Sequence, residues 1–99
     1  MRDLKNYSYP AVRIKDKRFI FNKACNDILK KENYRVFATV NYIIFIPATN
    51  RGERTNKISG NVMTCKELIG ESRVKQGIYK LYKFQDGAAI KRNELLLEC

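Results

Sequence analysis

The sequence predicts an α+β domain in which a small, mostly antiparallel sheet of about six strands carries two short helices, in the order ββαββ, loop, αββ. Three observations lead to this prediction. Hydrophobic residues make up 44% and charged residues 30% of the 99 positions, a globular composition in a chain long enough for one domain. Short stretches alternate apolar and polar residues, as half-exposed strands do. Turn-forming residues separate these stretches at the short intervals that hairpin connections require.

The first elements follow from this alternation. Residues 1–10 are expected to form a loose N-terminal arm that ends at a proline. Ala11–Lys15 places apolar and basic residues on opposite faces, which predicts a half-exposed strand. Asp16 and Lys17 predict a tight turn, and Arg18–Phe21, which is rich in β-forming residues, predicts the second strand of a hairpin.

Asn22 is a favourable N-cap, and it predicts a helix over residues 23–31 in which Cys25 and Leu29 recur at helical spacing. The remaining elements are expected to be strands over 34–40 and 43–46, a loop over 48–61, a short helix over 65–69, strands over 78–85 and 88–92, and a last apolar segment over 94–99.

Capping and turn residues set the bounds of the later elements. Thr64 is expected to cap the short helix, and Gly70 is expected to end it. Asp86 and Gly87 give the clearest hairpin-turn signal in the chain. The loop over residues 48–61 is polar and basic and contains two glycines, which is typical of exposed connections.

The charge of the chain predicts a polyanionic partner. Twenty Lys and Arg residues against ten Asp and Glu residues give a formal net charge of +10, and like charges at this density repel one another in a compact state. We expect DNA or RNA as the partner, or a host protein that itself binds nucleic acid. The candidate contact residues are Arg13, Lys15, Lys17, Arg18, Lys23, Arg51, Arg54 and Lys57.

Apart from Lys23, these cations fall into two groups, each with two interpretations. The hairpin over residues 11–21 holds four of them, either as a docking face or as charges that protect an edge strand from aggregation. The loop over residues 48–61 holds three, either as a binding loop or as a solvated connection.

One predicted strand interleaves aromatic residues and lysines: Tyr79, Lys80, Tyr82, Lys83 and Phe84. Such a pattern suits single-stranded nucleic acid, because bases stack on the rings while the cations contact phosphates. The alternative is a strand with its aromatic face in the core and its lysine face in water.

The residues of an enzyme active site are not apparent. The chain has no histidine, its serines have no evident activating partner, its acids are scattered, and it lacks a glycine-rich phosphate-binding fingerprint. We therefore expect no enzymatic activity, no cofactor and no metal site. Cys25 and Cys65 are expected in the core, whereas Cys99 is expected to be exposed. An odd number of cysteines without a signal-peptide pattern predicts a cytoplasmic protein, and no apolar run is long enough to predict a membrane partner.

Residues 12–46 resemble the swapped-hairpin domains of AbrB-like and SpoVT-like transcription factors. The resemblance rests on VRIKDKRFIFNKACNDIL followed by YRVFATVNYIIFI: a strand with an exposed cation, a turn, a basic residue, a short helix and a second hairpin. It implies a homodimer that exchanges hairpins and binds DNA through Arg13, Lys15, Lys17 and Arg18. The chain has Lys17, Asn22 and Asn26 where that family commonly has Gly, Pro and Arg.

Two further resemblances keep other functions open. RFIFNKAC and VMTCKEL are similar to segments of small proteins carried by phages and mobile elements of low-GC bacteria, which implies corresponding positions for Cys25 and Cys65. Such proteins include repressors as well as inhibitors of host defence nucleases, so an anti-CRISPR-like inhibitor that acts by protein contact is the alternative function. Tyr34-Arg35-Val36 followed by Arg51 and Arg54 faintly resembles RelE-type ribonuclease toxins, a minor alternative.

Overall fold

The computed structural model describes residue 4 and residues 7–48 and 55–98, and these ranges contain one eight-stranded antiparallel sheet. The strands are β1 (Ala11–Lys15), β2 (Arg18–Phe21), β3 (Asn33–Ala38), β4 (Tyr42–Pro47), β5 (Asn56–Lys57), β6 (Val62–Thr64), β7 (Gly77–Phe84) and β8 (Gly87–Glu98). One 3-10 helix, η2 (Lys23–Asp27), and one α-helix, α1 (Lys66–Ser72), accompany them.

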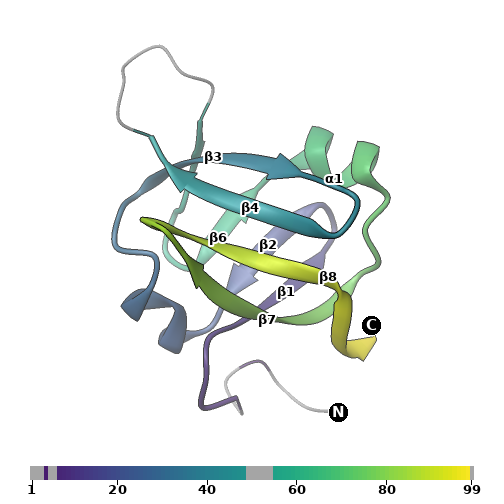
Figure 1. The fold of residues 1–99 in the computed structure, drawn as a ribbon, viewed down its shortest axis with the longest axis horizontal. Helices are drawn as coiled ribbons and strands as arrows, with labels where there is room; N and C mark the ends of the chain where they lie inside the picture. The colour runs from purple at the N-terminus through teal and green to yellow at the C-terminus, as the bar shows by residue number, and fades with distance from the viewer. Residues whose placement is uncertain (1–3, 5–6, 49–54, 99) are drawn as a thin grey trace.

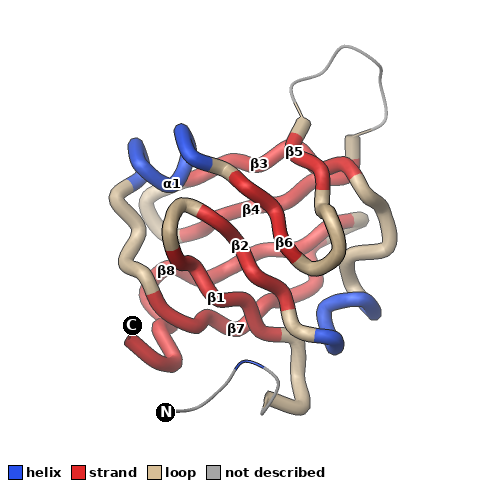
Figure 2. The backbone as a smooth tube through the Cα atoms, turned by 180° about the vertical axis from the view of Figure 1, so that it is seen from behind, coloured by secondary structure: helices blue, strands red, loops and turns tan. Residues whose placement is uncertain are grey.

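The sheet is rolled into a nearly closed barrel. Its strand order is β5-β3-β4-β8-β7-β1-β2-β6, so the two outermost strands are β5 and β6. Only four residues separate these strands, and an isolated bridge from Ser59, in this connection, to Val62 closes the turn between them. The strands β3, β4 and β8 form the near wall in Figure 1, and Figure 2 shows β1, β2 and β6 forming the opposite wall.

The core lies between these two walls and contains the inward-facing residues of nearly every strand. The rings of Phe19, Phe21 and Phe45 meet there, with 5.1 Å between the ring centroids of Phe19 and Phe45. Tyr34 and Tyr79 are also fully buried in this core. The large aromatic side chains thus do most of the filling in a chain that has no tryptophan.

The predicted fold class of six strands and two short helices is wrong in both numbers. The polar stretch over residues 48–61, predicted as a loop, contributes β5, and β6 follows directly after it. β5 pairs alongside β3, and β6 pairs alongside β2, both antiparallel. Both strands are too short to show an alternation of apolar and polar residues. They exist because their backbones bond to a neighbouring strand.

The first predicted helix is also wrong, because Asn22 does not cap it. Its side chain is buried and turned back toward the start of β1. Its Oδ1 accepts from the N–H of Ala11 at 3.0 Å, and its Nδ2 donates to the carbonyl of Tyr9 at 2.9 Å. Without a side-chain cap, the chain forms only the single 3-10 segment η2 before it leaves for β3.

The second predicted helix exists with different bounds. Thr64, the expected cap, is the last residue of β6, and Cys65 occupies the N-cap position. The helix also passes through Gly70, where it was expected to end, and it stops at Arg73, which takes the left-handed conformation with φ 54°.

The last hairpin turns one residue earlier than expected, at Gln85 and Asp86. Gly87 is instead the first residue of β8, where a Cβ atom would lie 1.8 Å from the carbonyl oxygen of Phe45. This glycine is therefore required by the close approach of β4. The apolar segment over residues 94–98 continues the same strand.

The described part of the N-terminal segment packs against the outer face of the barrel beside β1 and β7. Leu4 packs with Ala11 and Ile78, and Tyr7 and Tyr9 pack against the same cluster. This cluster, with Ile20 of β2 packed against it, covers part of the outer faces of β1, β2 and β7. No helix in the described ranges has the length and apolar character needed to cross a bilayer.

Candidate nucleic-acid interface

Over the outer face formed by β3, β4, β8 and the second half of β7, none of the described residues forms a helix (Figure 1). The strand registers place Phe37 opposite Ile44, Ile44 opposite Ala89, and Ala89 opposite Tyr82. These four residues form one row that crosses four strands on the outer face. We call this row and its outward-facing neighbours Arg35, Tyr42, Ile46, Lys80 and Lys91 the open face.

The open face presents aromatic rings to solvent. Phe37 and Tyr42 are 39% and 42% exposed, which is high for rings on a sheet. Tyr82 is half-buried, and Ala89, its neighbour in the row, is buried. Neighbouring strands lie about 4.8 Å apart, so Phe37 and Tyr82, three strands apart, are separated by about 14 Å along the row.

Lysines flank Tyr82 at one end of the row. The ammonium groups of Lys80 and Lys91 lie 5.1 Å and 4.7 Å from the centroid of its ring. The hydroxyl of Tyr82 donates to the carboxylate of Glu94, and Lys91 lies 3.6 Å from the same carboxylate. The hydrogen bond raises the pKa of the Tyr82 phenol and lowers the pKa of the Glu94 carboxyl, so the network keeps its charge distribution at neutral pH.

Arg35 occupies the other end. Its guanidinium carbon lies 4.9 Å from the centroid of the Phe37 ring, two residues along β3 on the same face. Each end of the row therefore pairs an aromatic ring with a cation. Rings give a base a surface to stack on, and the neighbouring cations lie where its phosphates would pass.

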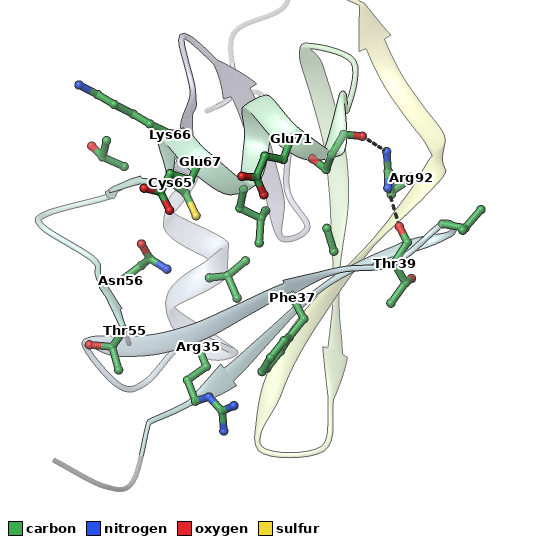
Figure 3. Close-up of a pocket in the computed structure, with 16 residues that line it drawn as sticks. Arg35, Phe37, Thr39, Thr55, Asn56, Cys65, Lys66, Glu67, Glu71 and Arg92 are labelled. Carbon is green, nitrogen blue, oxygen red and sulfur yellow. Dashed lines mark hydrogen bonds between the residues drawn. The ribbon is translucent and has the colours of Figure 1, made fainter. Parts of the chain in front are cut away.

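A groove of about 1200 Å³ borders the open face between β3 and α1 (Figure 3). Residues 35–40 form one wall, and residues 64–68, 71 and 72 form the other. Arg92 bridges the end of this groove, donating to the carbonyl of Thr39 and, at 2.6 Å, to the carbonyl of Ser72. Arg92 thus has a structural role in tying α1 to the β3–β4 turn.

The structure brings three of the predicted cations together at the tip of the β1–β2 hairpin. Lys15 lies directly opposite Arg18, and Lys17 occupies the turn between them with a positive φ. All three side chains are exposed. The tip packs beside α1, since the backbone N–H of Cys65 donates to the carbonyl of Lys17. We call these three residues the hairpin-tip cluster; it lies apart from the open face.

The other predicted contact residues are dispersed. Arg13 is half-buried on β1, between Ile20 of β2 and Ile78 of β7. Lys23 lies exposed on η2, and Lys57 lies exposed on β5. Arg51 and Arg54 lie outside the described residues.

Sequence reasoning missed several residues of the open face, although the alternation of side chains along a strand indicates which of them face the same side. Tyr79 and Tyr82 are three residues apart, so they must face opposite sides of one strand, with Tyr79 in the core and Tyr82 outside. The single aromatic face proposed for β7 therefore divides. Arg35 and Phe37 are two residues apart on β3, so the sequence already predicts that they face the same side. That they lie in line with Tyr82 depends on the register of four strands.

The two described cysteines and Tyr34 are buried and do not belong to the open face. Cys25 and Cys65 are buried, as predicted, and burial raises the pKa of both thiols, that of Cys25 to about 11. The hydroxyl of Tyr34 accepts from the backbone N–H of Lys31 at 2.9 Å inside the fold, which leaves it no access to an RNA phosphate. Among the described residues, no three acidic or cysteine side chains converge as metal ligands.

No family model matches the chain, and neither a curated protein nor a solved structure shows significant similarity to it. The resemblance to swapped-hairpin transcription factors, the homodimer it implies and the relation to phage proteins stay predictions.

Proposed function

We propose that this protein binds nucleic acid, and that the open face holds a single-stranded segment. The observation that carries the proposal is the row from Phe37 to Tyr82, which has a ring at each end and a cation stacked on each ring. An uncovered antiparallel sheet with exposed rings can stack unpaired bases, whereas the flat stack of a duplex hides its bases from such a surface.

The spacing of the row fits this mode of binding. Rings about 14 Å apart can each stack one base, with Ile44 and Ala89 between them. Lys80, Lys91 and Arg35 then neutralise phosphates along the strand, and the net charge of +10 draws the polyanion toward the molecule. The hairpin-tip cluster extends the positive surface beyond the row.

Fluorescence anisotropy with a labelled twelve-nucleotide single strand, as RNA and as DNA, tests the proposal against a duplex of the same sequence. We expect the single strands to bind more tightly. Phe37→Ala and Tyr82→Ala should each weaken binding by about 5- to 150-fold, because stacking contributes about 1–3 kcal/mol per base. Both side chains are partly exposed, so the melting temperature should change little.

Charge reversal separates local contact from overall charge. The double variant Lys80→Glu with Lys91→Glu should lose binding, whereas the control Lys30→Glu with Lys31→Glu changes the net charge equally at exposed residues away from the row. Equal losses in the two double variants would show that only net charge matters. Preference for the duplex, or full binding by both alanine variants, would refute the open face as the site.

Inhibition of a host defence nuclease by protein contact is the second candidate. The apolar exposure near the open face favours it: Val40 at the β3–β4 turn is 88% exposed, and Ile46 is 37% exposed. A protein partner would bury both. If Val40→Ser leaves the anisotropy titration unchanged but abolishes activity in a phage-protection assay, protein contact is the function.

A further inference from the structure

The N-terminal segment brings a further aromatic ring to the edge of the open face. Along the outer face of β7, Ile78 packs with Leu4, and the next two outward-facing residues are Lys80 and Tyr82. Tyr9 packs against the same cluster as Ile78, and the ammonium nitrogen of Lys80 lies 5.2 Å from the centroid of its ring. That nitrogen also lies 5.1 Å from the centroid of the Tyr82 ring. The rings of Tyr9 and Tyr82 therefore share one cation.

Hydrogen bonds on both sides fix the backbone at Tyr9. The Nδ2 of the buried Asn22 donates to the carbonyl of Tyr9 at 2.9 Å, and the N–H of Leu81 donates to the carbonyl of Pro10 at 3.0 Å. The Tyr7 ring packs edge-to-face with the Tyr9 ring, with 5.4 Å between their centroids. Tyr9 is half-buried, so its ring is held in place while part of it faces solvent. A side chain that is already ordered loses little conformational entropy when a ligand stacks on it.

Lys80 rests on the rings that a base would need, and the relative strength of the contacts decides which one forms. A stacked base contributes more than an exposed cation–π contact does. Lys80 has a long, half-buried side chain, so its ammonium group can leave the rings and form a charge-assisted hydrogen bond to a phosphate. One phosphodiester joins two neighbouring nucleosides. A cation shared by two rings is therefore well placed for the phosphate between two stacked bases.

We propose that the bound single strand continues past Tyr82 onto Tyr9, which stacks a further base, while Lys80 contacts the phosphate that joins these two bases. This path rests on the proposed function, because it extends the course of the strand across the open face. It makes the N-terminal segment part of the site. The ligand is then an unpaired segment long enough to reach Phe37, Tyr82 and Tyr9, and a shorter strand leaves one of the three rings unused.

Oligonucleotide length separates the contribution of Tyr9 from that of the rest of the site. The probes are labelled single strands of four and twelve nucleotides, titrated by fluorescence anisotropy against the wild type, Tyr9→Ala and Tyr9→Phe. We expect Tyr9→Ala to bind the longer strand about 5- to 150-fold more weakly, the loss of one stacked base. The shorter strand can occupy Phe37 and Tyr82 alone, so Tyr9→Ala should bind it almost as the wild type does. Tyr9→Phe keeps the ring and should bind both strands normally, which makes it the matched control.

Photo-crosslinking gives a second readout that needs no variant. A twelve-nucleotide strand that carries 5-iodouridine in place of uridine is irradiated in complex with the wild-type chain, and mass spectrometry identifies the crosslinked residues. We expect Tyr9 among them, together with Phe37 or Tyr82. A ring that only supports the fold would not crosslink, and its loss would weaken the binding of both strand lengths equally.

Three outcomes would overturn the extension to Tyr9 alone. Tyr9→Ala binds the longer strand as tightly as the wild type, it weakens both lengths equally, or the crosslinks include Tyr82 or Phe37 but not Tyr9. Failure of the proposed function has a different signature: Phe37→Ala and Tyr82→Ala both bind the twelve-nucleotide strand as the wild type does, and the extension then fails with it. A loss in Tyr82→Ala without a loss in Tyr9→Ala therefore distinguishes the two failures.

Discussion

At the scale of single residues, buried polar groups hold the N-terminal segment to the barrel. Asn22 bonds to residues on both sides of the start of β1, and the thiol of Cys25 donates to the carbonyl of Ala11 at 3.2 Å. A sequence shows Asn22 as a good cap and Cys25 as a good core residue, and only the second interpretation is confirmed. The first is wrong because a partner eleven residues earlier in the chain competes for the same side-chain oxygen.

Cys25 makes stability depend on pH in the alkaline range. Burial raises the pKa of its thiol from 9.0 to about 11, so the folded state holds the proton more tightly than the unfolded state does. This contribution is fully present below pH 9 and is lost as the pH rises through 11, a change of roughly 2–3 kcal/mol. Urea unfolding of the wild type and of Cys25→Ala between pH 8 and pH 11.5 measures it. The advantage of the wild type should shrink over this range, and a constant difference would contradict the prediction.

At the scale of elements, two glycines have opposite roles, and alanine substitutions distinguish them. Gly87→Ala would place a Cβ 1.8 Å from a backbone oxygen of β4, which no side-chain rotation relieves. We expect a loss of at least about 2 kcal/mol and a melting temperature lower by roughly 10 °C. Gly70→Ala lies inside α1 with only the end of the Lys17 side chain nearby, at 3.9 Å, and should stabilise by about 0.5–1 kcal/mol. Thermal melting of both variants decides between them, and similar shifts would contradict this assignment of roles.

The elements that sequence reasoning found are those with a pattern of their own. β2 has the predicted bounds, and the turn at Asp16 and Lys17 is confirmed by positive φ at both residues. β5 and β6 were not predicted because strands of two and three residues show no periodicity, and they form only by pairing with the edges of β3 and β2. The open face was not predicted for a related reason. The sequence shows the alternation within each strand, but the alignment of Phe37 with Tyr82 depends on how four strands pair.

At the scale of the whole molecule, salt should act on binding and on stability in opposite directions. The net charge of +10 means that like charges repel one another in the folded state. Lys15 and Arg18, which lie directly opposite each other, are one such pair. Added salt screens this repulsion, so the melting temperature should rise by a few degrees between about 20 mM and 500 mM NaCl. The single variant Lys15→Glu turns the like-charge pair with Arg18 into a pair of opposite charges and should show a smaller rise.

Nucleic-acid binding should weaken over the same range, because bound phosphates release their counterions. Three contacts, from Arg35, Lys80 and Lys91, predict a slope of about −2 in log affinity against log salt, which is about a twentyfold loss between 50 mM and 200 mM. Anisotropy titrations at four salt concentrations measure the slope, and differential scanning fluorimetry in the same buffers measures the stability. Since the protein becomes more stable as it binds less, a loss of affinity cannot be attributed to unfolding. A slope near zero would mean that the cations of the open face do not contact phosphates, and it would favour the protein-contact function.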